Sequence, residues 1–160
     1  MPLLHSLLSA DRVALLVEPV DRDRVLDAAA RLLSDAAPGT TQQIGDSLRT
    51  RERLGSTAIG HGIAIPHGRT TAFEEARGAF LRLAEPVDFG ATDGEPVDLI
   101  FAMAVPEHFT QQHLQLLSEL AERFADAGFR AALRSAPDIA SIRALLLDQA
   151  PAPVAAGGAR

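Results

Sequence analysis

The clearest chemical candidate in the chain is His67, which ends the segment GHGIAIPH and is followed by Gly68. Residues 63–65 (Ile-Ala-Ile) are a short apolar run typical of a buried strand, and Pro66 cannot donate a hydrogen bond to a sheet. We therefore expect the strand to stop at Pro66 and to display the imidazole beyond it. Gly68 leaves room for a close approach by another group.

A histidine placed in this way is suited to phosphoryl chemistry. Its ordinary pKa of about 6.5 leaves a free nitrogen lone pair near neutral pH. That nitrogen can accept a phosphoryl group and pass it on without help from a metal. The sequence contains no Cys, and all fifteen of its basic residues are Arg. This composition excludes disulfides, thiolate metal sites, cysteine nucleophiles, lysine Schiff bases and Walker-type phosphate loops.

Arg51 shares the apolar face of a predicted helix. We expect this helix to begin at Thr40 or Thr41, in a capping box closed by Gln43, and to end at Gly55. Measured around the helix axis, Arg51 falls about 20° from Ile44, inside the apolar stripe. A guanidinium there must bind an anion, form a structural salt bridge or lie along the edge of the core. The sequence leaves these interpretations open.

His113 lies on the inner face of another predicted helix, which runs from a Thr110 cap to Ala127 with Gly128 at its end. It falls about 40° from Leu117 around the axis, in the first helical turn. A helix N-terminus favours anions and a neutral imidazole, so His113 is suited to hold a phosphate. A histidine with satisfied hydrogen bonds at the edge of the core is the alternative interpretation.

The remaining loop histidines do not indicate a metal centre. A zinc site would need His61, His67, His108 and His113 together, but their spacing matches no dense ligand pattern. We therefore expect no metal and no cofactor. The positions of His61 and His108 give no further indication of a role.

The order of predicted elements favours a single α/β domain, with a mixed sheet and helices packed on its faces. Strands are expected at 13–17, 63–65, 79–84 and 97–105, with Arg82 facing water. Helices are expected at 2–10, from Asp21 to a stop at Pro38-Gly39, in the two helices described above, and from Pro137 to residue 147, with a short turn at 131–133. Residues 150–160, a Pro-, Ala- and Gly-rich tail, are expected to be disordered.

Composition and charge narrow the possible partners. The net charge is −6, with no Trp or Tyr and seven Phe, so we expect no nucleic-acid partner. The N-terminal apolar stretch lacks a basic segment and is broken by His5 and Ser6, which argues against a signal peptide. The longest apolar run, 99–105, is far shorter than the roughly 20 residues of a membrane helix. We therefore expect a cytoplasmic protein that does not insert into membranes.

Three motifs together resemble a known active-site signature. They are Arg-Glu at 51–52, Gly-Ser-Thr at 55–57 and Ile-Gly-x-Gly-Ile-Ala-Ile-Pro-His-Gly at 59–68. This combination resembles the enzyme IIA domains of the bacterial phosphoenolpyruvate-dependent sugar phosphotransferase system. Within that family it is most similar to the fructose/mannitol class and its nitrogen-regulatory branch. The resemblance covers residues 1–149.

The resemblance implies a role for each candidate residue. His67 would be the phosphorylated histidine, so that the chain is a phosphotransferase component with a phosphohistidine intermediate. The second active-site histidine of the family falls on His113, and its supporting arginine falls on Arg51. Position 61 is often a small polar residue in this motif, and His61 departs from that pattern.

The resemblance also implies partners. A histidine-containing phosphocarrier protein would donate the phosphoryl group. The acceptor would be a set of regulatory target proteins, as in a nitrogen-type IIA protein. The alternative acceptor is the cysteine of a sugar-specific IIB domain in fructose/mannitol-type uptake. This sequence has no Cys and therefore holds no such acceptor itself.

Overall fold

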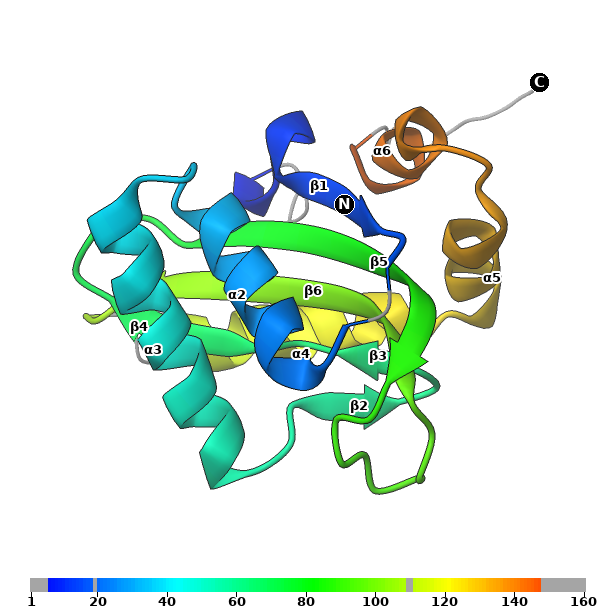
Figure 1. Cartoon of the computed structure of the whole chain (residues 1–160), viewed down its shortest axis with the longest axis horizontal. Coiled ribbons are helices and arrows are strands. Elements are labelled where there is room, and N and C mark those ends of the chain that lie inside the picture. Colours follow the sequence, from blue (N-terminus) through cyan, green and yellow to red (C-terminus); the bar gives the residue numbers. More distant parts are fainter. Residues whose placement is uncertain (1–5, 19, 109–110, 148–160) are drawn as a thin grey trace.

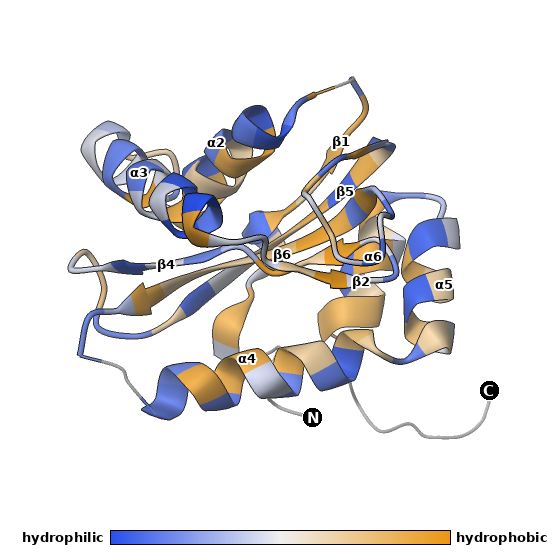
Figure 2. Cartoon of the chain, turned by 90° about the horizontal axis from the view of Figure 1, so that it is seen from below, coloured by the Kyte–Doolittle hydropathy of each residue, from blue (hydrophilic) through white to orange (hydrophobic). Residues whose placement is uncertain are grey.

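A mixed six-stranded sheet forms the middle of three layers, with helices on both of its faces (Figures 1 and 2). The structure, a computed structural model, describes residues 6–18, 20–108 and 111–147. Helices α2 and α3 cover one face of the sheet, and α4, α5 and α6 lie on the other (Figure 2). The predicted class, an α/β domain with a mixed sheet, is confirmed.

The described elements follow one another in this order. A short 3₁₀ turn, η1 (Ala10–Arg12), precedes β1 (Val13–Leu16), α2 (Arg22–Leu33) and α3 (Pro38–Leu54). Then come β2 (Ala58–Gly60), β3 (Ile63–Ala64), β4 (His67–Thr70), β5 (Arg77–Val87) and β6 (Val97–Pro106). The chain continues with α4 (Gln111–Phe124), α5 (Ala127–Ser135) and α6 (Ile139–Leu147).

Strand β6 lies at the centre of the sheet and is buried along almost its whole length. Its side chains alternate between the two faces, as strand geometry requires. Leu99, Phe101 and Met103 belong to the core under α4, α5 and α6, whereas Ile100 and Ala102 belong to the core under α2 and α3. This double burial explains the nearly continuous apolar run of β6 in the sequence.

Strands β3 and β4 lie one after the other along the same side of β6, and both run parallel to it. Ile63 pairs with Leu99 and His67 with Met103, so the register is unchanged across the gap between the two strands. Pro66 interrupts the strand because it has no N–H, but its carbonyl accepts a hydrogen bond from Met103 at 2.9 Å. The expected strand does stop before Pro66, because β3 ends at Ala64. The expectation that the following residue is displayed beyond the sheet is wrong, because His67 begins β4 and the chain pairs with β6 again.

Gly68 allows close packing between helix α3 and strand β4. A Cβ atom at this position would collide with the side chain of Ser47 and lie 3.1 Å from its backbone carbon. The Ser47 hydroxyl also donates a hydrogen bond to the Arg69 carbonyl at 2.9 Å. The group that approaches Gly68 is therefore a helix, which is held at a fixed distance from His67.

Helix α3 begins at Pro38, two residues earlier than the predicted capping box. Proline suits the first helical turn because its missing N–H needs no partner there. Ala37 occupies the cap without a side-chain hydrogen bond, and Gln43 instead bonds Thr70, whose hydroxyl donates to it at 2.6 Å. Pro38 therefore starts α3, and α2 has already ended at Leu33.

The C-terminal helices divide differently from the prediction. Helix α4 ends at Phe124, because Asp126 caps a separate helix by accepting hydrogen bonds from Gly128 and Phe129. Gly128 thus lies in the first turn of α5, which is longer than the predicted turn at 131–133. Arg82 does not simply face water, because it donates to the carbonyls of Leu133 and Ala136 at the end of α5.

The other differences are one additional strand, β2, in a stretch expected to be a loop, and the ends of several elements. Strand β1 stops one residue early, β5 extends in both directions beyond 79–84, and α6 begins at Ile139. Part of the predicted helix at 2–10, the Thr110 cap and the tail at 150–160 lie outside the described residues. None of the helices in the described part of the chain has the length and apolar character needed to cross a bilayer.

The close packing at Gly68 can be tested by substitution. We expect Gly68→Ala to lower the free energy of unfolding by about 1–3 kcal/mol, because the added methyl group forces α3 away from β4. Urea unfolding followed by circular dichroism measures this change.

Gly39→Ala is the matched control. Nothing lies within 4 Å of a Cβ atom at that position, which is in the first turn of α3. Alanine there should be neutral or stabilising by up to about 1 kcal/mol. Equal stability of the Gly68→Ala variant and the wild type would contradict the assigned packing.

Candidate active site

His67 is the first residue of β4 and lies on the sheet face that α4 covers, because it pairs with Met103. Its side chain is only 8% exposed. The imidazole is therefore buried, in contrast to the displayed side chain that the sequence predicted. Burial follows from the continuation of the strand past Pro66, which keeps His67 within the sheet.

One hydrogen bond determines the tautomer of His67. Its Nδ1 atom lies 2.9 Å from the Ile65 carbonyl oxygen. A carbonyl can only accept, so Nδ1 must carry the proton and donate it. In the neutral ring the lone pair available for chemistry is then on Nε2.

His113 lies in the first turn of α4, and its ring faces that of His67. The two ring centroids are 5.0 Å apart, and the planes meet at 72°. His113 is also 8% exposed, and its buried Nδ1 atom has no hydrogen-bond partner among the described residues. The interpretation of His113 as a histidine with satisfied hydrogen bonds therefore does not hold for this nitrogen.

Both imidazoles are held in the neutral form. Burial lowers the pKa of His67 below its ordinary value of 6.5, and the positive charges of Arg51 and Arg69 act in the same direction. The hydrogen bond to Ile65 and the negative charge of Glu52 raise this pKa but do not outweigh burial and the two arginines. Burial also lowers the pKa of His113, to about 4, with the same two arginines and His67 contributing. The pair can thus offer lone pairs and N–H groups near neutral pH.

Arg51 reaches the site from the last turn of α3. It is half-buried, and its Nη1 atom donates to the Gly55 carbonyl at 2.8 Å. The ion pairs found among the described residues do not include it, whereas Arg49 pairs with Asp27 and Asp46. The structure therefore gives no support to a salt bridge for Arg51, and its guanidinium lines the same cleft as His67.

The structure adds Arg69 to the predicted residues. It stands two positions after His67 on β4, so both side chains lie on the same side of the strand. Its guanidinium donates to the Glu107 carbonyl at 3.0 Å and lines the cleft. Strand alternation would have pointed to Arg69, but the sequence prediction ended the strand before it.

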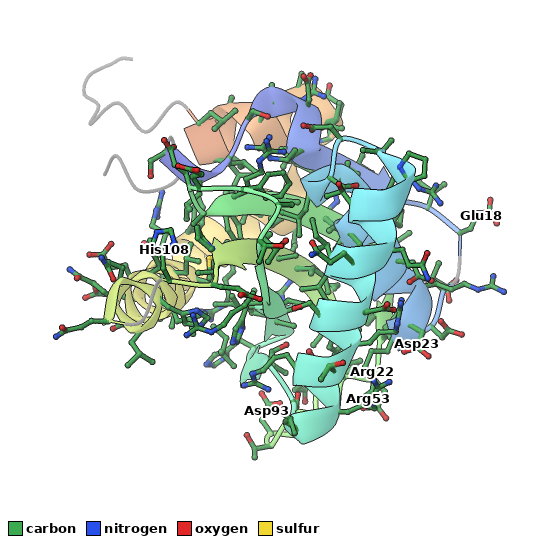
Figure 3. The ribbon with its side chains drawn as sticks, turned by 90° about the vertical axis from the view of Figure 1, so that its left-hand side faces the viewer. Glu18, Arg22, Asp23, Arg53, Asp93 and His108 are labelled. Atoms are coloured by element: carbon green, nitrogen blue, oxygen red, sulfur yellow. The ribbon has the colours of Figure 1, made fainter. Side chains whose placement is uncertain are left out.

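The site opens into a cleft of about 1030 Å³ between α3, β4 and the start of α4. Figure 3 views this side of the molecule, with α3 and α4 to either side of the sheet. Leu54 and Leu114 line the cleft and are 82% and 67% exposed. Among the described residues, the cleft is lined by Asp46, Ser47, Thr50, Arg51, Leu54, His67, Gly68, Arg69, Gln111, His113 and Leu114.

The other two histidines that the sequence singled out lie elsewhere. His61 lines a separate hollow of about 510 Å³ with Asp93 and Arg134, and its backbone N–H donates to Asp93 at 3.0 Å. His108 lies in the loop before α4 (Figure 3). Within the described ranges, no three His, Asp or Glu side chains are grouped closely enough to hold a metal ion.

This geometry can be compared with known proteins. The sequence profile of the family described as "Phosphoenolpyruvate-dependent sugar phosphotransferase system, EIIA 2" matches residues 6–149. The chain belongs to this enzyme IIA family. Its fold agrees with that of a nitrogen regulatory protein, IIA-Ntr from Neisseria meningitidis, with a TM-score of 0.80 and 39% identity. That match covers 90% of this chain and 99% of the other.

Among curated relatives, this enzyme IIA chain is 40% identical over 146 residues to the nitrogen regulatory protein of Pseudomonas aeruginosa. The match covers 91% of this chain and 95% of that protein. This chain is also 37% identical over 136 residues to the 2-O-alpha-mannosyl-D-glycerate-specific EIIABC component of the phosphotransferase system of Escherichia coli. That match covers 83% of this chain but 21% of the larger protein.

The lowered pKa of His113 predicts a pH-dependent stability. Because the folded-state pKa of about 4 lies below the unfolded value of 6.5, the unfolded chain binds more protons between these pH values. The stability that the protein gains from a neutral, buried His113 is fully present above about pH 6.5 and is lost as the pH falls through about 4. We expect a flatter dependence between pH 4 and 6.5 in His113→Gln, measured by urea unfolding at several pH values.

A histidine titration by NMR provides the internal control. In the native protein the resonance absent from the His113→Gln spectrum should titrate near pH 4. In urea-unfolded protein all histidines should titrate near pH 6.5. A native His113 midpoint near pH 6.5 would overturn this assignment.

Proposed function

We propose that this enzyme IIA chain is a histidine phosphocarrier that accepts a phosphoryl group on Nε2 of His67. Its donor is a histidine-containing phosphocarrier protein. The observation that carries the proposal is the 2.9 Å contact from His67 Nδ1 to the Ile65 carbonyl, which leaves Nε2 as the nucleophilic atom. Two arginines and a second neutral imidazole line the same cleft.

The transfer step needs no group beyond these side chains and the donor. The Nε2 lone pair attacks the phosphorus atom, the new Nε2–P bond forms, and the donor P–N bond breaks with its electron pair returning to the donor imidazole. As Nε2 bonds to phosphorus, the His67 ring becomes positively polarised. The Nδ1–H bond to Ile65 stabilises that charge, and the proton stays in place.

The neighbouring cations stabilise the charge of the phosphoryl oxygens. The planar guanidinium of Arg51 can bind two oxygens at once, and Arg69 adds a second positive charge. His113, neutral because of its lowered pKa, can donate an N–H to the phosphoryl group without repelling either arginine. These groups supply orientation and charge stabilisation, which are the main requirements of phosphoryl transfer.

The proposed role is mainly regulatory and cytoplasmic, with the phosphorylation state of His67 controlling binding to target proteins. Support comes from the similarity to nitrogen regulatory proteins over nearly their full length. The alternative is transfer to the cysteine of a IIB domain during sugar uptake. The similarity to a sugar-specific EIIABC component supports this alternative.

Labelling in a reconstituted relay tests the carrier step. With phosphoenolpyruvate, enzyme I and the histidine-containing carrier, wild-type protein should become labelled, and His67→Gln should not. Proton-nitrogen-phosphorus NMR of the product should place the phosphoryl group on Nε2. Arg51→Gln and His113→Gln should fold but become labelled about 10²-fold more slowly.

His108→Gln is the matched control, since His108 is not part of the cleft lining, and it should be labelled at the wild-type rate. Persistent labelling of His67→Gln would contradict the assigned nucleophile. Phosphorylation on Nδ1 would contradict the proposed tautomer.

A transfer experiment separates the two acceptors. Wild-type protein carrying radioactive phosphate is mixed with a purified IIB domain that has its active-site cysteine, and separately with candidate kinases and ion transporters. For the regulatory role we expect little loss of label to IIB and binding to a target that differs between the phosphorylated and unphosphorylated forms. Rapid transfer to the IIB cysteine, absent when that cysteine is replaced, would favour transport.

A further inference from the structure

Glu52 is a buried acid that the proposed transfer step does not use. It follows Arg51 in the last turn of α3 and is only 4% exposed. Its two carboxylate oxygens each accept one hydrogen bond from Thr57, at 2.8 Å from the backbone N–H and 2.7 Å from the hydroxyl. A buried carboxylate is costly unless it is bonded in this way, so the arrangement holds Thr57 tightly.

Thr57 connects Glu52 to the strand that carries the nucleophile. Its carbonyl accepts a hydrogen bond from the backbone N–H of Ile65 at 3.0 Å. The carbonyl of Ile65 in turn accepts the Nδ1–H of His67 at 2.9 Å. A continuous series of hydrogen bonds therefore runs from the carboxylate on α3 to the ring that receives the phosphoryl group.

The same loop also holds Arg51. Gly55, two residues before Thr57, supplies the carbonyl to which the Arg51 guanidinium donates at 2.8 Å. Ser56, between them, donates from its hydroxyl to the Phe89 carbonyl at 2.5 Å. The hydrogen bonds between Thr57 and Glu52 thus fix the loop that positions both His67 and Arg51.

We propose that Glu52 is a positioning residue for phosphoryl transfer, acting through Thr57 and Ile65 on the tautomer and orientation of His67 and through the 55–57 loop on Arg51. This inference rests on the proposed function of His67. Glu52 does not touch the transferred group. It acts by holding the Ile65 carbonyl where Nδ1 must donate to it, which keeps the lone pair on Nε2.

A purely structural role would predict a different result. If the bonds to Thr57 only secured the end of α3, their loss would lower stability but leave the His67 ring in one tautomer. A positioning role predicts a change in the ring itself. The tautomer of His67 and the nitrogen that becomes phosphorylated are therefore the deciding measurements.

The test uses Glu52→Gln in the full chain. The amide keeps the size of the side chain but removes its negative charge. Its single oxygen can accept from only one of the two Thr57 donors, and its NH2 can bond the hydroxyl only if the hydroxyl turns to accept, so two charge-assisted hydrogen bonds are replaced by weaker neutral ones. We expect nitrogen NMR of His67 to show a mixture of Nδ1–H and Nε2–H forms. We also expect labelling from the carrier to slow by about 10- to 100-fold, with part of the label on Nδ1.

Matched variants separate an effect on the orientation of His67 from an effect on the stability of the fold. Glu122→Gln makes the same change at an exposed site on α4 and should leave tautomer and labelling unchanged. Thr57→Val removes the hydroxyl and should reproduce the defect of Glu52→Gln, whereas Thr57→Ser keeps the hydroxyl and should restore most of the rate. Leu146→Ala, a core substitution on α6 outside the cleft lining, serves as a destabilised variant whose bonds from Glu52 to His67 are intact.

The outcomes are distinct for the two proposals. A single Nδ1–H tautomer and an undiminished labelling rate in both Glu52→Gln and Thr57→Val would overturn the role of Glu52. If Glu52→Gln does not fold, the comparison of Thr57→Val with Thr57→Ser decides the question. Failure of wild-type protein to become labelled would overturn the carrier function instead, and the tautomer measurement would still test Glu52.

Discussion

The site depends on one hydrogen bond, from Nδ1 of His67 to the carbonyl of Ile65, formed across the break that Pro66 makes in a strand. Strands β3 and β4 pair with β6 in a common register, so the backbone positions before and after Pro66 are both held against the same strand. A side chain two residues beyond its acceptor can then bond back to the backbone. The interruption thus supplies a fixed acceptor for Nδ1.

Burial makes the hydrogen bond between Nδ1 of His67 and the Ile65 carbonyl decisive for the tautomer of the ring. In water the two neutral tautomers of an imidazole interconvert freely, but at 8% exposure few competing partners remain. The same burial lowers the pKa of both histidines, which keeps them neutral next to Arg51 and Arg69. Two cations can therefore share the cleft with two imidazoles without direct repulsion, and their combined field favours a dianionic group between them.

The sequence predicted the parts of the site that depend on local patterns. Helical phase placed Arg51 and His113 on inner faces, and the IAIPH segment singled out His67. The sequence alone could not predict the place of Arg69 or the packing at Gly68. Both depend on the fact that the chain forms a strand from His67 onward, parallel to β6. The ends of helices were misplaced for a related reason: Pro38 and Gly128 can end one helix or lie in the first turn of the next, and only the neighbouring caps decide which.

Arg51 and Glu52 illustrate why adjacent residues in a functional motif need not act on the same group. Neighbours on a helix point about 100° apart. One side chain consequently faces the cleft, while the other is buried against the loop that follows the helix. The loop accepts a hydrogen bond from Arg51 at the Gly55 carbonyl and donates two to Glu52 from Thr57. Any movement of the end of α3 would therefore displace Arg51 and His67 together. The Arg-Glu pair and the Gly-Ser-Thr loop are therefore joined by hydrogen bonds and hold the site together. The connection between the two motifs lies in these contacts and not in their order in the sequence.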